Sequence, residues 1–525
     1  ESKKPSPLDI TSVEYDLEKM TVKWNQSQDI DFKQYNLHYS DSENGTKTQI
    51  RTFTNISTTS FDTTTFDPTK HNWYFLEVLD IFGLKSMGKG KPNSIENIPN
   101  TTEIDSIIYS YNEKSLTIYW SENTEYDFES YTLFETNSIG GDVNQVFSTT
   151  DRSTNFHKVS NINEGLYKYY NITTQDKWGL KSTSQIYSGN SYIKFIKTYG
   201  YEGNGGDVIQ HDKGYTLTGW SDSKNIVVIS TDFLGDVLWK KEFIFYKMGR
   251  GFSIINTSDG GYIIVGSGQK DSESSKETQI IKLSSEGDLE WSKSYGDNQT
   301  GGYSIVETSE GDFVYSTRWG LCKISKDGDL LWNKLLPTSE NRPMTVSNGG
   351  SGFISSSPLM DSGYVGLTVY SISTSGDLVH SKNYISNFTH SPMSITHSTD
   401  NGYIITGYTN ESTRSTFVTK YNGSLIQQWY YTFTDSDGLS MGMNVSPTIN
   451  GNFLGFIVTG RSSKGIFLHK LNSSGVMEWE SVIEEGNWGY SVIQSKDGGY
   501  VITGSTNSNP NEVTLIKTDD KGRLE

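Results

Sequence analysis

One stretch of about forty residues recurs along the second half of the chain. Its clearest copy, residues 251–291, reads GFSIINTSDGGYIIVGSGQKDSESSKETQIIKLSSEGDLEW, and seven variants of it fill the sequence from about residue 192 to the end. Each copy places a Gly-rich turn between short apolar runs and closes on Trp. The closing Trp recurs at spacings of 41 to 52 residues, with His380 in its place in one copy: Trp239, Trp291, Trp332, Trp429 and Trp479. Such a period indicates small supersecondary units that bury their apolar faces against one another.

The repeat predicts a seven-bladed β-propeller, because each copy has room for four short strands and so supplies one four-stranded blade. The last copy ends at residue 525, where its Trp is expected. Residues 195–200 (FIKTYG) match residues 292–296 (SKSYG), which follow Trp291. We therefore expect the first strand of this region to complete the last blade and close the ring, which removes free sheet edges.

Two full DGGY turns, Asp259–Tyr262 and Asp497–Tyr500, and four degraded forms occupy one position of the repeat. On these residues the region resembles the DGGY-type propeller repeats of secreted and surface-bound proteins of bacteria and archaea. The resemblance covers about 330 residues and implies a propeller at an extracellular or cell-surface location. It implies no particular activity, because propellers serve binding, scaffolding and catalysis alike.

The first 190 residues contain two copies of a different unit. MTVKW at 20–24 matches LTIYW at 116–120, and WYFLEVLDIFGLKS at 73–86 matches YYNITTQDKWGLKS at 169–182. Each copy alternates apolar and polar residues over about seven short runs, which is typical of a small β-sandwich.

Both copies resemble fibronectin type III modules, on an early Trp, a Tyr-containing strand and a late Asp-x-x-Gly-x-x-Ser hairpin. These landmarks are Trp24, Tyr35, Tyr39 and residues 80–86 in the first copy, and Trp120, Tyr131 and residues 176–182 in the second. The resemblance implies that both Trp side chains are core residues and that Gly83 and Gly179 adopt positive φ in the last hairpin. We favour a spacer or stalk role over partner docking for this pair.

The expected protein is therefore all-β, with two β-sandwich (fibronectin type III-like) modules and a seven-bladed β-propeller. We place a tether at residues 1–7, the modules at 8–100 and 101–190, and the propeller at 191–525. With 13% aromatic residues and no sustained 3.6-residue apolar period, the chain favours strands over helices. The net charge of −18 argues against nucleic acid or an anionic membrane as partner, because both require a basic patch.

No apolar run approaches the ~20 residues that span a bilayer, so we expect no transmembrane segment. The lead ESKKPSP is polar and contains Pro, like the tethers found behind cleavage or lipidation points. A lipid or another surface anchor at the N-terminus, as in a lipoprotein, is therefore compatible with the sequence.

The candidate binding site lies on the side of the propeller that carries the longer, variable loops, because binding usually resides in such loops on a rigid scaffold. Aromatic and arginine residues suited to stacking on a sugar ring or holding a carboxylate gather there. They are Trp220, Arg250, Arg318, Trp319, Arg342, Tyr408 and Trp488. The alternative is that several of these Trp only cover blade edges.

Small residues align on the innermost strands, where crowding at the axis explains them without any function. They are Gly206, Ser253, Ser304, Thr345, Ser394, Asn444 and Ser491.

Motifs for catalysis and for metal binding are absent. None of the eight His falls in a metal-binding pair, and the one cysteine, Cys322, allows no disulfide and is expected to be buried. Asp435-Ser-Asp437-Gly438 opens like a calcium loop but lacks the Glu at its twelfth position. We therefore predict no metal, no cofactor and no identifiable catalytic residue.

These observations favour a surface or secreted binding or adhesion protein whose propeller presents a face to a glycan or a protein partner. A first alternative is an extracellular carbohydrate-active enzyme, a hydrolase or lyase, which for glycoside hydrolysis needs two carboxylates about 5–10 Å apart. A second alternative is a structural subunit of a surface assembly, which would expose a large apolar patch.

Overall fold

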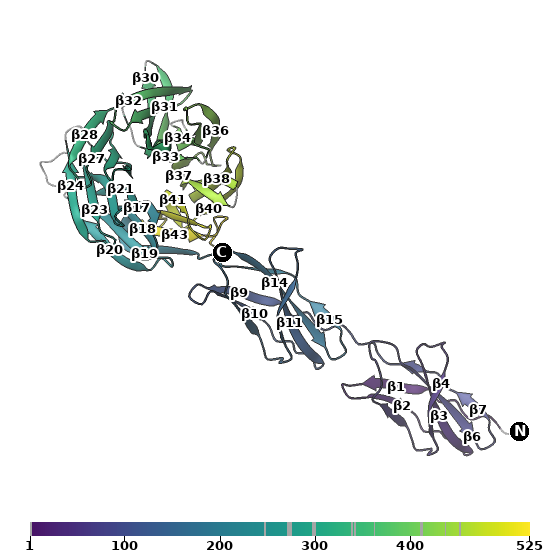
Figure 1. Ribbon diagram of the computed structural model, residues 1–525. Helices are drawn as coiled ribbons and strands as arrows, with labels where there is room; N and C mark the ends of the chain where they lie inside the picture. The colour runs from purple at the N-terminus through teal and green to yellow at the C-terminus, as the bar shows by residue number, and fades with distance from the viewer. Residues whose placement is uncertain are drawn as a thin grey trace. The chain divides into compact units, whose positions relative to one another are not determined.

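The computed structural model is all-β, and its chain divides into two compact units, Glu1–Ser191 and Tyr192–Glu525. It describes residues 3–245, 248–269, 276–296, 301–337, 340, 343–361, 363–398, 400–409, 413–435, 437–450 and 453–524. Within these ranges the only helical element is one 3-10 turn, Asn348–Gly350. Figure 1 shows the strands of both units.

The first half of the first unit contains two antiparallel sheets. One sheet is formed by β1 (Ile10–Tyr15), β2 (Met20–Trp24) and β5 (Ser60–Thr63). The other is formed by β3 (Phe32–Ser40), β4 (Thr48–Phe53), β6 (Trp73–Asp80), β7 (Lys85–Met87) and β8 (Lys91–Pro92).

The second half repeats this arrangement strand for strand, with the same sheet orders. One sheet is formed by β9 (Ile104–Ser110), β10 (Ser115–Trp120) and β13 (Phe156–Ser160). The other is formed by β11 (Phe128–Thr136), β12 (Asn144–Thr149), β14 (Tyr167–Asp176), β15 (Lys181–Thr183) and β16 (Tyr187–Asn190).

The landmark residues hold equivalent places in the two halves. Trp24 and Trp120 are buried, each with its ring about 6 Å from the ring of a buried Tyr, Tyr35 or Tyr131. At the last hairpins, Asp80 and Asp176 accept two backbone N–H bonds each, and the following Gly83 and Gly179 have φ of 85° and 86°. A short acceptor side chain and a Gly at positive φ are what a tight turn requires.

The second unit is a β-propeller: its sheets stand around a central axis, with inner strands such as β17, β21, β37 and β41 at the opening and β20, β24, β28 and β40 at the rim (Figure 1). Five antiparallel sheets are four-stranded, and each follows the chain order from the inside outward. Their strands are β21 (Arg250–Asn256), β22 (Tyr262–Gly268), β23 (Glu277–Leu283), β24 (Leu289–Tyr295); β25 (Ile305–Glu307), β26 (Phe313–Ser316), β27 (Gly320–Ile324), β28 (Leu330–Leu335); β29 (Met344–Val346), β30 (Gly352–Asp361), β31 (Tyr364–Ser373), β32 (Leu378–Ser386); β33 (His390–His397), β34 (Tyr403–Thr409), β35 (Thr416–Tyr421), β36 (Gln427–Phe433); and β37 (Ser440–Asn450), β38 (Phe453–Ser462), β39 (Gly465–Asn472), β40 (Met477–Ile483).

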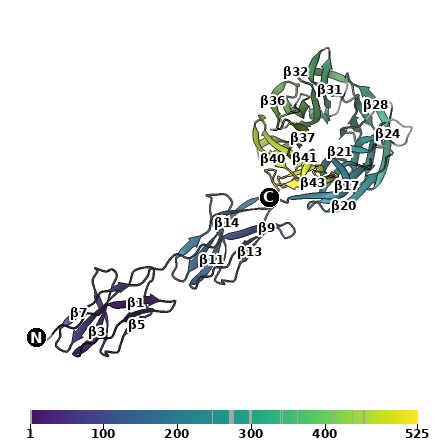
Figure 2. The same cartoon turned by 180° about the vertical axis from the view of Figure 1, so that it is seen from behind.

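The remaining sheet joins the two ends of this unit through one long strand, β17. Its strands are β17 (Phe195–Gln210), β18 (Gly214–Ser221), β19 (Ile226–Asp232), β20 (Val237–Phe243), β41 (Gly486–Gln494), β42 (Tyr500–Thr506) and β43 (Glu512–Thr518). The start of β17 pairs with β43, with Phe195 opposite Lys517 and Thr198 opposite Thr514, while its end pairs with β18. Figure 2, seen from behind, again places β17 beside β43.

Apolar side chains fill the space between neighbouring sheets. One core cluster, for example, joins Ile226 and Val228 of β19 to Ile254 of β21 and Ile264 of β22. The near-continuous apolar runs of the second and third strands are explained by this arrangement, since sheets packed on both faces bury both faces of their central strands.

Candidate functional site

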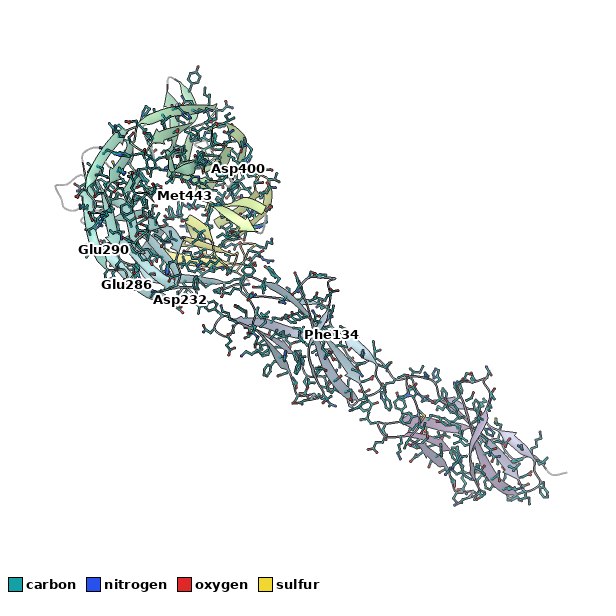
Figure 3. All side chains as sticks on the ribbon, in the orientation of Figure 1. Phe134, Asp232, Glu286, Glu290, Asp400 and Met443 are labelled. Atoms are coloured by element: carbon teal, nitrogen blue, oxygen red, sulfur yellow. The ribbon has the colours of Figure 1, made fainter. Side chains whose placement is uncertain are left out.

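A cavity of about 500 Å³ opens on the axis of the propeller. Most of its lining comes from the inner strands β17, β21, β29, β33, β37 and β41 and from residues that precede β25. The second strands β18 and β34 contribute Trp220 and Tyr408. Figure 3 shows Met443, one of the lining residues, at the central opening of the ring. The volume lies within the range of small-molecule sites, roughly 300–1,000 Å³.

A β-bulge in each of five inner strands supplies part of the lining of this cavity. Each bulge inserts one extra residue between two paired positions, and all five extra residues line the cavity: Gly206, Phe252, Met393, Met443 and Tyr490. A bulge turns one side chain out of the normal alternation. In four of the five strands the extra residue is large, and it lines the cavity beside the small residues of the innermost ring.

The residue after each bulge belongs to that innermost ring, and here the structure corrects the sequence alignment. The register pairs Asp207 with Thr218 in the same way as it pairs Ser253 with Val265 and Asn444 with Thr459. Asp207, and not Gly206, is therefore the member of the ring in its blade. The sequence alignment missed it because the bulge shifts the count by one residue.

Asp207 joins three inner strands through its carboxylate. Its Oδ1 accepts the Ser491 hydroxyl at 2.7 Å and the Val208 N–H at 2.9 Å, and its Oδ2 accepts the Ile254 N–H at 3.0 Å. Burial among these strands raises the pKa of Asp207, and the hydrogen bonds lower it only in part. Asn444 repeats the pattern by accepting the Val492 N–H at 3.2 Å.

Arginines stack on aromatic rings around the same cavity. The Arg250 guanidinium lies 5.3 Å from the Trp220 ring, Arg461 lies 4.8 Å from Trp488, and Arg414 lies 5.5 Å from Tyr408. Such cation–π contacts fix the position of the guanidinium. One N–H group of Arg414 also donates to the sulfur of Met441, a lining residue.

Tyr490 connects two of these pairs. Its ring lies 5.2 Å from the ring of Trp220 and 5.4 Å from that of Trp488. Burial raises the pKa of Tyr490 to about 12, against the opposing positive charges of Arg250 and Arg461. Both arginines therefore act on the same lining side chain, Tyr490.

The opposite, tight-turn side of the ring pairs its charges. Lysines on the outer strands bind the Asp of the Gly-Asp turn in the next sheet, in the pairs Lys197–Asp236, Lys241–Asp288, Lys293–Asp329 and Lys334–Asp377. Lysines on the third strands bind the acidic residues of the DGGY-type turns, in pairs that include Lys282–Asp259, Lys323–Asp312, Lys420–Asp400 and Lys517–Asp497. By contrast, Arg250, Arg318, Arg414 and Arg461 form no ion pair with any described carboxylate.

The structure brings together four of the seven residues that the sequence nominated. Trp220, Arg250, Tyr408 and Trp488 line the one cavity. Arg318 and Trp319 lie between β26 and β27, 5.1 Å from each other and outside the cavity lining. Arg342 lies outside the described residues.

Sequence reasoning missed Asp207, Tyr490, Arg414 and Arg461 as site residues. A signal was present for Arg414, since it follows the second strand of its sheet as Arg318 does, whereas Arg461 lies within β38, the second strand of its own sheet. Nothing local marked Asp207 or Tyr490, because their direction depends on the bulge.

Other candidate chemistry stays outside this cavity. Cys322 is buried, and burial raises the pKa of its thiol to about 12, which disfavours the reactive thiolate. Asp435 accepts the N–H groups of Leu439 and Ser463 and so serves as a turn acceptor. No cluster of three metal-ligating side chains occurs in the part of the chain that the structure describes. Within that same part, no helix has the length and apolar character needed to cross a membrane.

The comparisons with known proteins give similar folds only. No protein-family model matches the chain, and no curated protein matches it in sequence. Among solved structures, it is similar to the WD40 domain of Neurospora crassa Pan2, at 9% identity and TM-score 0.43 over 61% of this chain and 93% of that one. It is also similar to Sqt1 from Chaetomium thermophilum, at 8% identity and TM-score 0.40 over 81% of this chain and 99% of that one. The low scores leave the propeller fold resting on the strand pairing above, and no role is transferred from either protein.

Proposed function

We propose that this chain is an extracellular or cell-surface binding protein that captures a ligand in the axial cavity of its propeller. The observation that carries the proposal is that three arginine–aromatic pairs each place their aromatic ring in the lining of one cavity. These pairs are Arg250–Trp220, Arg461–Trp488 and Arg414–Tyr408, and Arg250 lines the cavity itself. Aromatic side chains together with a few placed polar groups are common in ligand sites.

The wider architecture supports this role. We infer that the ring has seven four-stranded blades, because β17 supplies an inner strand to one and an outer strand to another, besides the five four-stranded sheets. We also infer that the two halves of the first unit are fibronectin type III-like modules that act as a stalk. Their paired three- and five-stranded sheets and their equivalent Trp, Tyr and Asp landmarks support this assignment.

The hydrolase alternative finds less support at this site. Asp207 is the only carboxylate among the described residues that line the cavity, and it is engaged by Ser491 and by backbone N–H groups. Hydrolysis by two carboxylates needs a second one about 5–10 Å away. The described lining therefore favours binding over that chemistry.

The assembly-subunit alternative predicts a large continuous apolar patch. The first residues of four outer strands are exposed aliphatics, Val237, Leu289, Leu330 and Leu378. Each directly follows an Asp that is ion-paired to the preceding sheet. In three of these strands the next residue is also an exposed aliphatic, Leu238, Leu331 or Val379, so short apolar stretches lie beside ion pairs on the rim.

A glycan and peptide binding screen with the full chain tests the proposal. Intrinsic tryptophan fluorescence should report saturable binding, and Trp488→Ala should weaken it at least tenfold because the ring that carries Arg461 is lost. Trp73→Ala, in the first module, is the matched control and should leave binding unchanged. Absence of a saturable ligand, or equal binding by Trp488→Ala and the parent, would refute the cavity as the binding site.

A further inference from the structure

We propose that the ligand of the axial cavity is an acidic saccharide, one that carries carboxylate or sulfate groups. This inference rests on the proposed binding function and specifies the class of ligand. It follows from three features of the site: arginines that form no ion pair with a described carboxylate, inner strand edges that are interrupted by bulges, and hydroxyl and amide groups in the cavity lining.

The charge of the site points to an anion. The chain carries 62 acidic against 44 basic residues, yet Arg250, Arg414 and Arg461 form no ion pair with a described carboxylate, whereas lysines of the tight-turn side are paired. Arg461 lies against Trp488 with its Nε buried and without a hydrogen-bond partner. A guanidinium held in this way offers parallel N–H groups that match a carboxylate or sulfate bidentately.

The strand edges around the axis are poorly suited to a peptide. A peptide needs partners for its own N–H and C=O groups, and an exposed strand edge is the usual partner. Here bulges interrupt five inner edges at the level of the cavity. Two of the N–H groups just below, those of Ile254 and Val492, are already taken by Asp207 and Asn444. A continuous ladder with a peptide strand is therefore blocked.

The remaining groups suit a sugar. Ser253, Ser304, Ser394 and Asn444 line the cavity together with the aromatic residues. The Ser304 hydroxyl donates to the Met344 carbonyl and the Asn444 amide donates to Ser394, which leaves acceptor capacity on these side chains for ligand hydroxyls. These hydroxyl and amide groups match the polar rim of a pyranose.

The test measures the binding of paired probes to the full chain by calorimetry and tryptophan fluorescence. The probes are trigalacturonate with its methyl ester, a sulfated heparin tetrasaccharide with its desulfated form, and a hexaglutamate peptide. We expect at least one acidic saccharide to bind tenfold or more tightly than its neutral partner, with an affinity that falls as salt is raised.

Charge variants test the same inference at the level of residues. Arg250→Met and Arg461→Met should each weaken binding of the acidic probe at least tenfold. Each should also reduce the difference in affinity between the acidic and the neutral probe. Arg461→Lys should retain part of the affinity for the acidic probe. Lys241→Met is the matched control, because Lys241 is paired with Asp288 on the other side of the ring, and it should bind like the parent. Arg250 is exposed, so Arg250→Met carries the test if Arg461→Met does not fold.

Equal affinity for acidic and neutral saccharides would overturn the inference and leave the binding proposal standing. Binding of hexaglutamate without binding of either acidic saccharide would also overturn it, in favour of an acidic peptide. Failure of all the probes and of the wider glycan and peptide screen would refute both proposals.

Discussion

Asp207 is the residue at which the inner ring departs most from its neighbours. Serine or asparagine occupies the register-equivalent positions in four other blades, at Ser253, Ser394, Asn444 and Ser491. Asp207 lies on β17, the strand that pairs with both β18 and β43, and its carboxylate receives donors from β21 and β41. It therefore connects neighbouring blades at the seam of the ring.

Asp207→Ala should lower the free energy of unfolding by about 2–4 kcal/mol, because several donors lose one shared acceptor. Asp207→Asn should cost about half as much, since Asn444 performs a similar role in its own blade. Urea unfolding of both variants at pH 7 measures the difference. A loss below about 1 kcal/mol in the alanine variant would contradict a structural role for this carboxylate.

His469 gives the fold a dependence on pH. Its ring is buried on β39 between Phe433 and Phe467, with centroid distances of 3.9 and 4.8 Å, and burial lowers its pKa from 6.5 to about 4. The unfolded chain therefore takes up a proton below pH 6.5 while the folded chain stays neutral. The stabilisation is complete above pH 6.5 and is lost as the pH falls towards 4, by roughly 2–3 kcal/mol.

Chemical unfolding of the parent and of His469→Ile across pH 4 to 7 tests this dependence. Isoleucine is the residue at the equivalent position of β23, Ile281, beside Lys282 as His469 is beside Lys470. The variant should lack this part of the pH slope. Parallel curves for parent and variant would show that His469 is not its source.

At the scale of the elements, the closing Trp of each repeat packs on the turn of the next one. A Cβ built on Gly287 would lie 2.6 Å from Trp239, and one built on Gly328 would lie 3.0 Å from Trp291. These glycines also have φ of 80°, so they satisfy both the turn and the close approach of the ring. Phe195 takes the place of the missing last Trp, beside Gly235.

The one exception changes both partners together. His380 replaces the Trp, and the matching turn position holds Leu425 at φ 57°, buried beside Tyr421 and Tyr384. We infer that Leu425 fills the space that a Trp ring occupies in the other blades.

A double-mutant cycle tests this exchange. Leu425→Gly alone should cost about 1–2 kcal/mol, because the loss of a buried side chain outweighs the relief of its positive φ. Adding His380→Trp should recover at least about 1 kcal/mol of that loss, since neighbouring groups that share one space are non-additive. Thermal and urea unfolding of the four proteins gives the coupling free energy between positions 380 and 425. If the two changes in unfolding free energy are additive, the two side chains do not share one space.

At the scale of the whole propeller, ring closure depends on a pairing between the two ends of the unit. The Thr514 hydroxyl donates to the Lys197 carbonyl, 317 residues away in sequence. Elsewhere the third and fourth strands of a sheet are joined by a short turn. The seam therefore relies on a long-range contact whose loop-closure entropy is unfavourable.

Thr198→Pro and Ser294→Pro form a matched pair at equivalent positions of the seam and of an ordinary blade. Each substitution places proline within a strand, where the loss of the backbone N–H group disfavours strand pairing. Thr198→Pro should lower Tm by about 5 °C or more beyond the effect of Ser294→Pro. The reason is that no short turn joins the start of β17 to β43, so the two strands can separate. Calorimetry and limited proteolysis of the full chain provide the readout, and equal effects would show that the seam is no weaker than a hairpin.

Much of the propeller could be predicted from sequence, because its pattern is local. Apolar runs, Gly-rich turns and a recurring Trp specify strands and turns within each repeat, and the copy-to-copy match indicates stacking. Trp220, Arg250, Tyr408 and Trp488 were nominated for their loop position and for their aromatic or arginine side chains, and they do meet at one cavity. The same reasoning included Arg318 and Trp319, which lie outside the lining, because loop position gives the side of the ring and not the distance from its axis.

By itself, the sequence determined the all-β class, the repeat and the place of each turn, since these follow from residue types at short range. Only the tertiary structure decided that Asp207 and Tyr490 line the cavity and that Arg414 and Arg461 stack on two of its lining residues, Tyr408 and Trp488. The physical reason is that a bulge changes side-chain direction without a local sequence mark. In addition, a site assembled from blades far apart in sequence exists only once the ring has closed.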